Sequence, residues 1–343
     1  MTQAGVMQQE IQYCAASDGV RLAYATMGKG PLIVRAPHWF THLEYDLNSP
    51  VQRHFVLGLA HRHRLLRYDT RGNGLSQRDV SDISFERWVS DLETVIDAAG
   101  FDRFALVGIS QAASISIAYA ARHPERVSHL IIYCGFARGL LQRDGDPEKL
   151  KQSLDLARAV VREGWGSEAE SHRQFFTSQF IPDGTAEQQH ALNELERISA
   201  TPAMAERTLV ELANVNVVDL LAKVKAPTLV MHVRGDLRVP FALGQEIAGG
   251  IPGAKFVPLE GRNHMVLPNE PAHREFYNAM ATFLGGKPTR GPLPGTATVG
   301  ERLEKTVGSV ERNWFIKVVV IFAALTGCVL FFMEMWKLLY AGH

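Results

Sequence analysis

The most informative pattern of this chain lies in the segment Arg103-Phe-Ala-Leu-Val-Gly-Ile-Ser-Gln-Ala-Ala-Ser-Ile-Ser-Ile-Ala-Tyr-Ala-Ala-Arg122. Its first part is an apolar run that predicts a buried strand, and its last part, from Ala112, predicts a helix. Between them, Gly108-Ile-Ser-Gln-Ala112 predicts a tight turn. Larger side chains at Gly108 or Ala112 would collide with the incoming helix. The small residues therefore allow the backbone to hold Ser110 in a strained conformation with its hydroxyl exposed, as a nucleophile requires.

Two further segments supply the partners that a serine nucleophile needs. Residues 226–233 predict a buried parallel strand, and Asp236 lies in the loop just past it. Lys255-Phe-Val-Pro-Leu259 predicts a shorter strand, and His264 lies just past that one. Catalytic groups in open parallel sheets gather at the carboxyl ends of the strands. We therefore expect Ser110 to attack an acyl carbonyl, His264 to carry the proton, and Asp236 to orient the imidazole and stabilise its charged form.

Taken singly, these residues have simpler explanations. A Gly-Asp pair after a strand is commonly a plain turn, and a lone histidine such as His264 is commonly a surface residue. Other candidates for the base are His232, inside its strand, His123, at the end of the helix that follows Ser110, and His38. Asp219 is a weaker candidate for the acid because it precedes the strand. The order serine, aspartate, histidine, with each residue in a loop past a strand, favours the first assignment.

These residues resemble the α/β-hydrolase superfamily over residues 13–284. The strand, turn and helix around Ser110 are similar to the nucleophile elbow of that family, although its usual second glycine is Ala112 here. Tyr68-Asp-Thr-Arg-Gly-Asn-Gly-Leu-Ser76 resembles the Asp-x-Arg-Gly-x-Gly-x-Ser turn that follows an early strand of the family. The resemblance implies an α/β fold, with a mostly parallel sheet flanked by helices and a helical cap over the pocket.

A closer likeness is to the branch of this superfamily that is fused to bacterial nucleotide cyclases or winged-helix regulators. That likeness implies a second possibility, a module that senses a small molecule. The matching segments are residues 36–46, 67–76 and 128–139.

The oxyanion hole departs from the pattern of many relatives. One donor should be the backbone N–H of Gln111, at the start of a helix, where free N–H groups and the helix dipole favour negative charge. Many relatives carry His-Gly after the strand at residues 32–35, but this chain has Ala36-Pro37-His38-Trp39. Pro37 has no N–H, so the second donor would be His38, which we favour, or Trp39. Trp39 and Phe40 are expected to line the pocket; the alternative is that they pack under the cap.

The composition is that of an ordinary globular protein. Of the 343 residues, 46% are hydrophobic and 21% are charged, and the formal net charge is zero, so no nucleic-acid partner is indicated. The three cysteines, Cys14, Cys134 and Cys328, are scattered and indicate neither a disulfide framework nor zinc. We expect no metal, no organic cofactor and no signal peptide.

The pattern along the chain predicts a core interrupted by a cap. Residues 11–15 and 22–27 predict a hairpin, residues 32–35, 64–68, 104–108 and 127–134 predict parallel strands, and residues 85–99 predict a helix. Helical patterns at residues 148–163, 186–199 and 203–212 predict the cap. We place the core at residues 1–136 and 223–285, the cap at 137–222, a linker and juxtamembrane segment at 286–313, a transmembrane helix at 314–336 and a short tail at 337–343.

The predicted transmembrane helix is the second strong signal. Residues 314–333 are almost entirely apolar, with Lys317 as their one charged side chain, and about twenty apolar residues span a bilayer core. Trp314, Trp336 and Tyr340 lie near its ends, as interfacial aromatic residues do. The alternative is a buried C-terminal core helix. Because basic residues gather before the span, we expect a single-pass C-terminal anchor with the catalytic domain on the cytoplasmic face.

The sequence thus predicts a membrane-anchored serine hydrolase that cleaves an ester or related acyl bond. Its expected partners are a small-molecule, lipophilic acyl substrate, the lipid bilayer and a membrane protein. The alternative from another class is a sensor or scaffold module that keeps its triad without turnover and acts on a membrane partner. Cofactor-free haloperoxidase or perhydrolase chemistry at the same triad is a third possibility.

Overall fold

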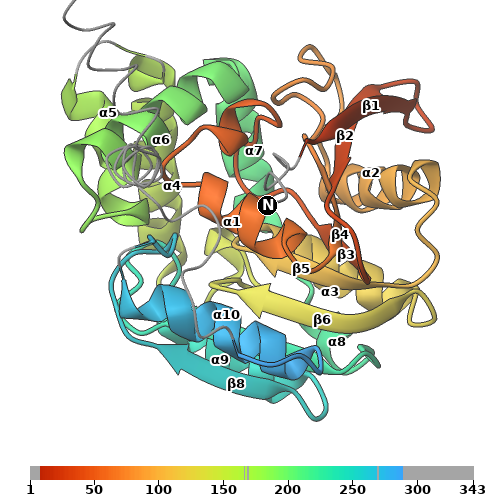
Figure 1. The fold of residues 1–343 in the computed structure, drawn as a ribbon. Helices are drawn as coiled ribbons and strands as arrows, with labels where there is room; N and C mark the ends of the chain where they lie inside the picture. Colours follow the sequence, from red (N-terminus) through yellow and green to blue (C-terminus); the bar gives the residue numbers. More distant parts are fainter. Residues whose placement is uncertain (1–7, 166, 168–169, 269, 289–343) are drawn as a thin grey trace, which may run out of the picture. The chain divides into compact units, whose positions relative to one another are not determined.

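The computed structural model describes residues 8–165, 167, 170–268 and 270–288. Its described part is built on an eight-stranded sheet in the order β1-β2-β4-β3-β5-β6-β7-β8 (Figure 1). Strand β2 is antiparallel to both of its neighbours, and every other neighbouring pair is parallel. The strands are β1 (Glu10–Ala15), β2 (Arg21–Met27), β3 (Leu32–Arg35), β4 (Arg64–Tyr68), β5 (Phe104–Ile109), β6 (Val127–Tyr133), β7 (Thr228–Val233) and β8 (Lys255–Leu259).

Helices cover both faces of this sheet and gather at the carboxyl ends of its strands. Two short 3-10 turns, η1 (Tyr45–Leu47) and η2 (Leu140–Gln142), lie in connecting loops. The α-helices are α1 (Arg53–Ala60), α2 (Phe85–Ala98), α3 (Ala112–Arg122), α4 (Pro147–Gly164), α5 (Glu170–Phe180), α6 (Ala186–Ser199), α7 (Pro202–Asn214), α8 (Val218–Leu221), α9 (Phe241–Gly250) and α10 (Pro271–Phe283).

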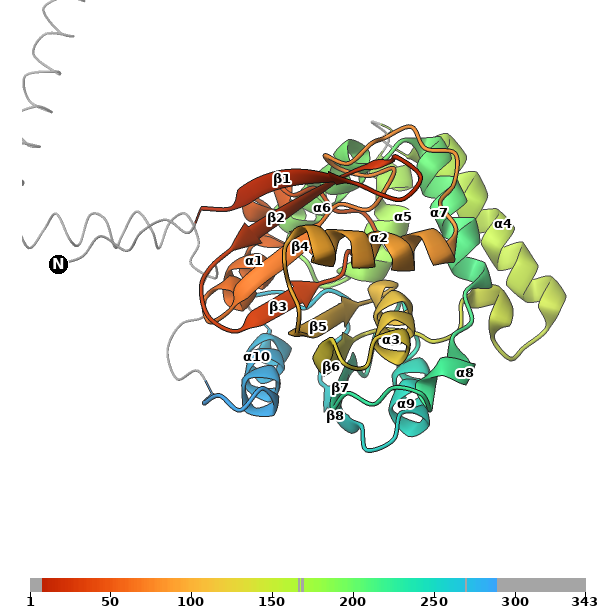
Figure 2. The same ribbon diagram turned by 90° about the vertical axis from the view of Figure 1, so that its right-hand side faces the viewer.

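Each face of the sheet has its own hydrophobic cluster. Figure 2 shows α2, α3, α8 and α9 on one face and α1 and α10 on the other. Side chains such as Trp88 of α2 and Ile115 of α3 belong to the first cluster, and Phe55 of α1 and Phe276 of α10 belong to the second. All six residues of β5 are buried, as a strand covered on both faces must be. The nucleophile candidate therefore follows a strand at the centre of the core.

Helix α2 forms as its sequence pattern predicts. Trp88, Leu92, Val95 and Ile96 lie on one side and are all buried. Gly100, just after the helix, has φ +67°, a conformation that glycine adopts without strain. The predicted helix, residues 85–99, is thus confirmed to within one residue.

The cap consists of helices α4 to α7. Its two ends are held together at its base by the isolated bridge between Arg138 and Asn216. Side chains cap three of the helices, since Asp146 accepts from the first turn of α4, Thr185 forms a capping box with α6, and Thr201 accepts from α7. In Figure 1 the arrows of β6 and β8 point toward the side where these helices gather. The cap therefore covers the strand ends at which catalytic groups are expected.

Most sequence-based boundaries are confirmed, and the sequence analysis did not predict helices α1, α5, α8, α9 and α10. Strands β3, β4 and β8 and helix α6 have the predicted bounds. Helix α1 was missed because it is short and contains Gly58, whose place against the Tyr277 side chain leaves no room for a larger residue. Helix α5 was missed because its sequence, Glu-Ser-His-Arg-Gln-Phe-Phe-Thr-Ser-Gln-Phe, is rich in residues of modest helix propensity.

The predicted linker and transmembrane helix, residues 286–313 and 314–336, lie outside the described residues apart from 286–288, and so does Cys328. Among the helices that the structure describes, none is both long and apolar enough to cross a bilayer.

Candidate active site

Ser110 occupies the turn between β5 and α3 with the geometry that the sequence predicts. Its φ is +56°, a left-handed conformation that is uncommon for a residue with a side chain. Its backbone N–H donates to the carbonyl oxygen of Tyr133 at 3.0 Å, which ties the turn to the end of β6. A Cβ on Gly108 would lie 2.7 Å from the carbonyl oxygen of Ala112 and 2.9 Å from the Cα of Ala113. Glycine at 108 is therefore required for α3 to approach the strand.

Asp236 and His264 lie in loops past β7 and β8 and bond directly to each other. Nδ1 of His264 is 2.7 Å from Oδ2 of Asp236, and both residues are buried. The other carboxylate oxygen, Oδ1, accepts the backbone N–H groups of Arg238 at 2.8 Å and Val239 at 3.0 Å. Burial alone would raise the pKa of Asp236, but the charge and hydrogen bond of His264 and the Val239 N–H hold that pKa below its usual value. Asp236 is therefore an ionised partner for His264.

Ser110 and His264 meet at one narrow, mostly apolar cavity. Both line it, together with residues of the loop after β3 and of the cap. Within the described residues, Nε2 of His264 forms no hydrogen bond, so the bond from the Ser110 hydroxyl is not made in this conformation. Because Nδ1 is committed to Asp236, Nε2 is the ring atom left to exchange a proton. Such bonds are often longer in ligand-free sites than in substrate complexes.

The other histidines have structural surroundings. His232 is fully buried, and its Nε2 lies 2.9 Å from the carbonyl oxygen of Val239. Burial lowers the pKa of His232, so the ring is neutral and donates to that carbonyl. His123 stacks on Tyr119, with ring centroids 4.6 Å apart, at the end of α3. Asp219 lies in the short helix α8. The Nε2 atom of His232 also lies 3.5 Å from Oδ2 of Asp236, so His232 borders the acid. Neither His232, His123 nor Asp219 lines the two cavities that contain Ser110, whereas His264 lines one of them.

His38 lies in the same cavity as Ser110. Burial, with a smaller contribution from the Arg35 charge, lowers the pKa of His38 to about 3, so its ring is neutral. Its Nδ1 lies 2.9 Å from the carbonyl oxygen of Trp39. In the part of the chain that the structure describes, the backbone N–H groups of Gln111, His38 and Trp39 donate to no acceptor. Gln111 therefore offers a free N–H at the start of α3, and His38 and Trp39 both remain candidates for the second donor.

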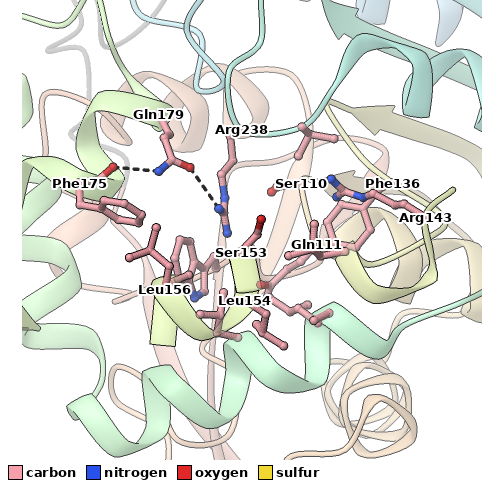
Figure 3. A pocket seen from close by; sticks show the side chains of 17 residues that line it. Ser110, Gln111, Phe136, Arg143, Ser153, Leu154, Leu156, Phe175, Gln179 and Arg238 are labelled. Carbon is pink, nitrogen blue, oxygen red and sulfur yellow. Dashed lines mark hydrogen bonds between the residues drawn. The ribbon is translucent and has the colours of Figure 1, made fainter. Parts of the chain in front are cut away.

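A larger cavity of about 310 Å³ opens on the other side of Ser110, between the core and the cap (Figure 3). Trp39 lines both cavities, and Phe40 lines the narrow one. The predicted pocket residues therefore reach the site and also pack against the cap, with Phe40 4.5 Å from Trp165 between ring centroids. Of the cap aromatics, Phe175 lines the larger cavity and Phe180 the narrow one.

Three ionisable residues at the site were missed in the sequence. Arg143 and Arg238 line the larger cavity, and Glu196 of α6 lines the narrow one. Arg238 had a signal, because it stands two residues after Asp236 in the same loop. Arg143 and Glu196 had none, since charged residues are common in helical segments and only the folding of the cap brings these two to the site.

One set of possible metal ligands was found among the described residues, namely Cys134, Asp236 and His264, whose ligand atoms lie within 4.8 Å of one another. Burial raises the pKa of the Cys134 thiol far above its usual value, so the thiol stays protonated. The Asp236 and His264 atoms bond to each other at 2.7 Å, which leaves no space for an ion between them. This arrangement fits an acid–base pair and does not fit a metal centre.

The comparisons agree with this fold. The profile of the family described as alpha/beta hydrolase fold matches residues 40–271, and the chain belongs to that family. The AB hydrolase superfamily protein YisY of Bacillus subtilis is 27% identical over 258 residues, which cover 74% of this chain and 91% of YisY. The putative carbamate hydrolase RutD of Azorhizobium caulinodans is 30% identical over 216 residues, covering 61% of this chain and 77% of RutD.

Among solved structures, an esterase from Exiguobacterium antarcticum superimposes with a TM-score of 0.68 at 21% identity. The match covers 80% of this chain and 99% of the esterase. The relatives support a hydrolase, and the likeness to the esterase structure supports the fold.

Proposed function

We propose that this protein is a serine hydrolase that cleaves an ester or related acyl bond and is held at a membrane by its C-terminal segment. The observation that carries the proposal is the convergence of three groups. Ser110 stands on a strained turn, His264 lines the same cavity, and Asp236 fixes His264 with a 2.7 Å bond. Esterases and a putative carbamate hydrolase among the similar proteins support acyl chemistry.

The reaction follows from the positions of the atoms. Oγ of Ser110 attacks the acyl carbonyl carbon while Nε2 of His264 accepts its proton. The negative charge that develops on the carbonyl oxygen is stabilised by the N–H of Gln111 and a second donor, His38 or Trp39. His264 then gives the proton to the leaving alcohol. In the second half of the reaction, His264 takes a proton from a water molecule, which attacks the acyl carbonyl carbon. The acid is released, and His264 gives the proton back to Oγ of Ser110.

The membrane anchor is proposed from the apolar run at residues 314–333. A span of this length crosses a bilayer core, and the catalytic domain would then face the cytoplasm and receive an acyl substrate at the membrane surface. The test is alkaline carbonate extraction of membranes from cells that express the full chain. The protein should stay with the membranes. Two charged substitutions in the run, Val319→Lys with Leu325→Lys, should release it, since each charge costs about 3 kcal/mol at the centre of a bilayer.

Labelling with a fluorophosphonate probe tests the hydrolase proposal. This probe reacts covalently with activated serines. Wild-type protein, purified in detergent, should be labelled, and Ser110→Ala should not be. Ser116→Ala is a matched control, because Ser116 is a nearby serine within α3 and is fully buried. If folded wild-type protein resists the probe and cleaves no aryl ester, the hydrolase proposal is wrong. The sensor or scaffold alternative would then account for the arrangement of Ser110, His264 and Asp236 without turnover.

A further inference from the structure

The larger cavity beside Ser110 contains two arginine side chains in a mostly apolar lining. Arg143 enters from the segment after η2, and Arg238 from the loop that carries Asp236. In the view of Figure 3, Ser110 lies between the two guanidinium groups. The apolar part of the wall is formed by residues of α4 and α7 and the loop after β6, among them Phe136, Leu154, Ala157, Leu209 and Ala213. Two guanidinium groups in one mostly apolar cavity, close enough for the charge of Arg143 to act on Arg238, favour a substrate that carries negative charge.

The guanidinium of Arg238 is fixed by aromatic rings and an amide. It lies 4.8 Å from the centre of the Trp39 ring and 5.4 Å from that of Phe180. Its Nη1 donates to Oε1 of Gln179 at 3.3 Å, as Figure 3 shows. Among the described residues it forms no ion pair with a carboxylate. Burial lowers the pKa of Arg238 to about 10, with the Arg143 charge acting in the same direction, so the group is still charged at neutral pH.

Arg143 is held in a similar way. Its guanidinium lies 5.8 Å from the centre of the Phe136 ring, and its Nε donates to the carbonyl oxygen of Arg138 at 3.4 Å. Burial lowers its pKa, opposed by the charge of Glu246. Glu246, however, forms its ion pair with Arg138. Within the described part of the chain, Arg143 therefore also has no carboxylate bonded to it.

The acidic groups nearest to this pair are already engaged or neutral. Asp236 bonds to His264 and to two backbone N–H groups. Burial raises the pKa of Glu196 to about 8, although Arg238 acts against it, so Glu196 is mostly protonated at pH 7. By contrast, the buried guanidinium of Arg71 is matched by Asp91 at 2.7 Å. Partly desolvated like charges repel unless an anion joins them.

From this arrangement we propose that the acyl substrate carries a free carboxylate, which Arg238 and Arg143 bind in the larger cavity while Ser110 attacks the ester carbonyl. The inference rests on the proposed hydrolase function and narrows its substrate class. A planar guanidinium matches a carboxylate with two parallel hydrogen bonds. Aromatic rings contact both groups, Trp39 and Phe180 at Arg238 and Phe136 at Arg143. A volume of about 310 Å³ is at the lower end of small-molecule pockets. A half-ester of a short dicarboxylic acid fits these limits better than a neutral lipid.

The test compares two esters that differ in one charge. Monophenyl glutarate has a free carboxylate, and phenyl methyl glutarate is its neutral counterpart. For wild-type protein, kcat/KM should be at least about tenfold higher for the anionic ester. Arg238→Gln and Arg143→Gln should each lower kcat/KM for the anionic ester by about 10- to 100-fold, a larger loss than either variant causes with the neutral ester. Arg162→Gln is the matched control, because Arg162 is an exposed arginine of α4 that pairs with Glu206.

The pattern of loss separates a binding role from a structural one. If Arg238→Gln disrupts the packing of Trp39 and Phe180, kcat/KM falls equally for both esters and the melting temperature falls. That result would overturn the proposal. Arg238→Lys keeps the charge and removes the planar fork, so it should restore part of the preference for the anionic ester. If wild-type protein hydrolyses both esters equally and depends on Ser110, the hydrolase proposal stands and the carboxylate proposal is wrong.

A binding measurement keeps the carboxylate proposal testable if neither ester is turned over. Calorimetric titration of Ser110→Ala with monophenyl glutarate should show binding that phenyl methyl glutarate lacks. Ser110→Ala combined with Arg238→Gln should abolish this binding. Equal binding of the two esters to Ser110→Ala, or equal absence of binding, would refute the carboxylate proposal.

Discussion

Replacing Asp236 with Asn tests the most specific feature of the site, the tautomer of His264. Oδ1 of Asp236 accepts two backbone N–H groups, from Arg238 and Val239, and Oδ2 faces Nδ1 of His264 at 2.7 Å. An asparagine has one oxygen and one NH₂ group. Because the two backbone donors require the oxygen at the first position, the NH₂ group must face His264. Nδ1 of His264 would then accept a hydrogen bond, and the ring proton would move to Nε2.

A proton on Nε2 removes the base. With Nε2 protonated, His264 cannot accept the proton of Ser110, although the shape of the site hardly changes. The same substitution in the serine proteases that define this type of triad lowers kcat by about 10⁴, which corresponds to about 5.4 kcal/mol of activation free energy at about 1.36 kcal/mol per tenfold. We expect a loss of that order here, with little change in thermal stability.

The assay is the rate of phenyl ester hydrolysis, measured beside the rate of fluorophosphonate labelling. Both should fall by about the same factor, because both need a deprotonated Nε2. Asp219→Asn serves as the matched control, since Asp219 lies in α8 and should leave both rates unchanged. Wild-type turnover by Asp236→Asn would show that another group orients the base and that our assignment of the acid is wrong.

Three further predictions concern stability and are read from thermal unfolding. Gly108→Ala should cost about 1–3 kcal/mol because the new Cβ would lie 2.7 Å from the Ala112 carbonyl oxygen; an unchanged melting temperature would contradict the packing of the turn. Ser110→Gly should be about 1 kcal/mol more stable than Ser110→Ala, since glycine tolerates φ +56°; equal stability would show that the turn is unstrained. Burial raises the pKa of Glu196 from 4.5 to about 8, so the folded state binds a proton that the unfolded state has released. Its stability contribution therefore falls as the pH rises through that window, and Glu196→Gln should stabilise the protein more at pH 8 than at pH 5. The same advantage at both values would contradict the raised pKa.

Local patterns in the sequence were enough to predict the sheet. Strands β3, β4 and β8 have the predicted bounds because each is a short apolar run between turn residues. The order of Ser110, Asp236 and His264 also followed from the sequence, since each stands just past a strand. Parallel strands bring their carboxyl ends to one edge, so these loops had to be neighbours.

The missed elements depend on contacts between distant parts of the chain. Helix α1 contains Gly58, a poor helix residue by itself, and its place is fixed by close packing against Tyr277 of α10. Helix α5 is rich in residues of modest helix propensity, yet its Phe176 and Phe180, four residues apart, are buried against Trp39. Long-range burial stabilised both helices where local propensity did not.

The sequence by itself determined the type of chemistry, and the tertiary structure determined where charge lies around it. Ser110 needs a turn that only a strand, small residues and a helix can make, and that pattern is local. The roles of Arg143 and Glu196 have no local sequence pattern, because both residues reach the site only when the cap folds over the strand ends. Burial by the cap lowers the pKa of Arg238 and raises that of Glu196. Desolvation depends on every neighbour that excludes water, so only the folded chain could reveal it.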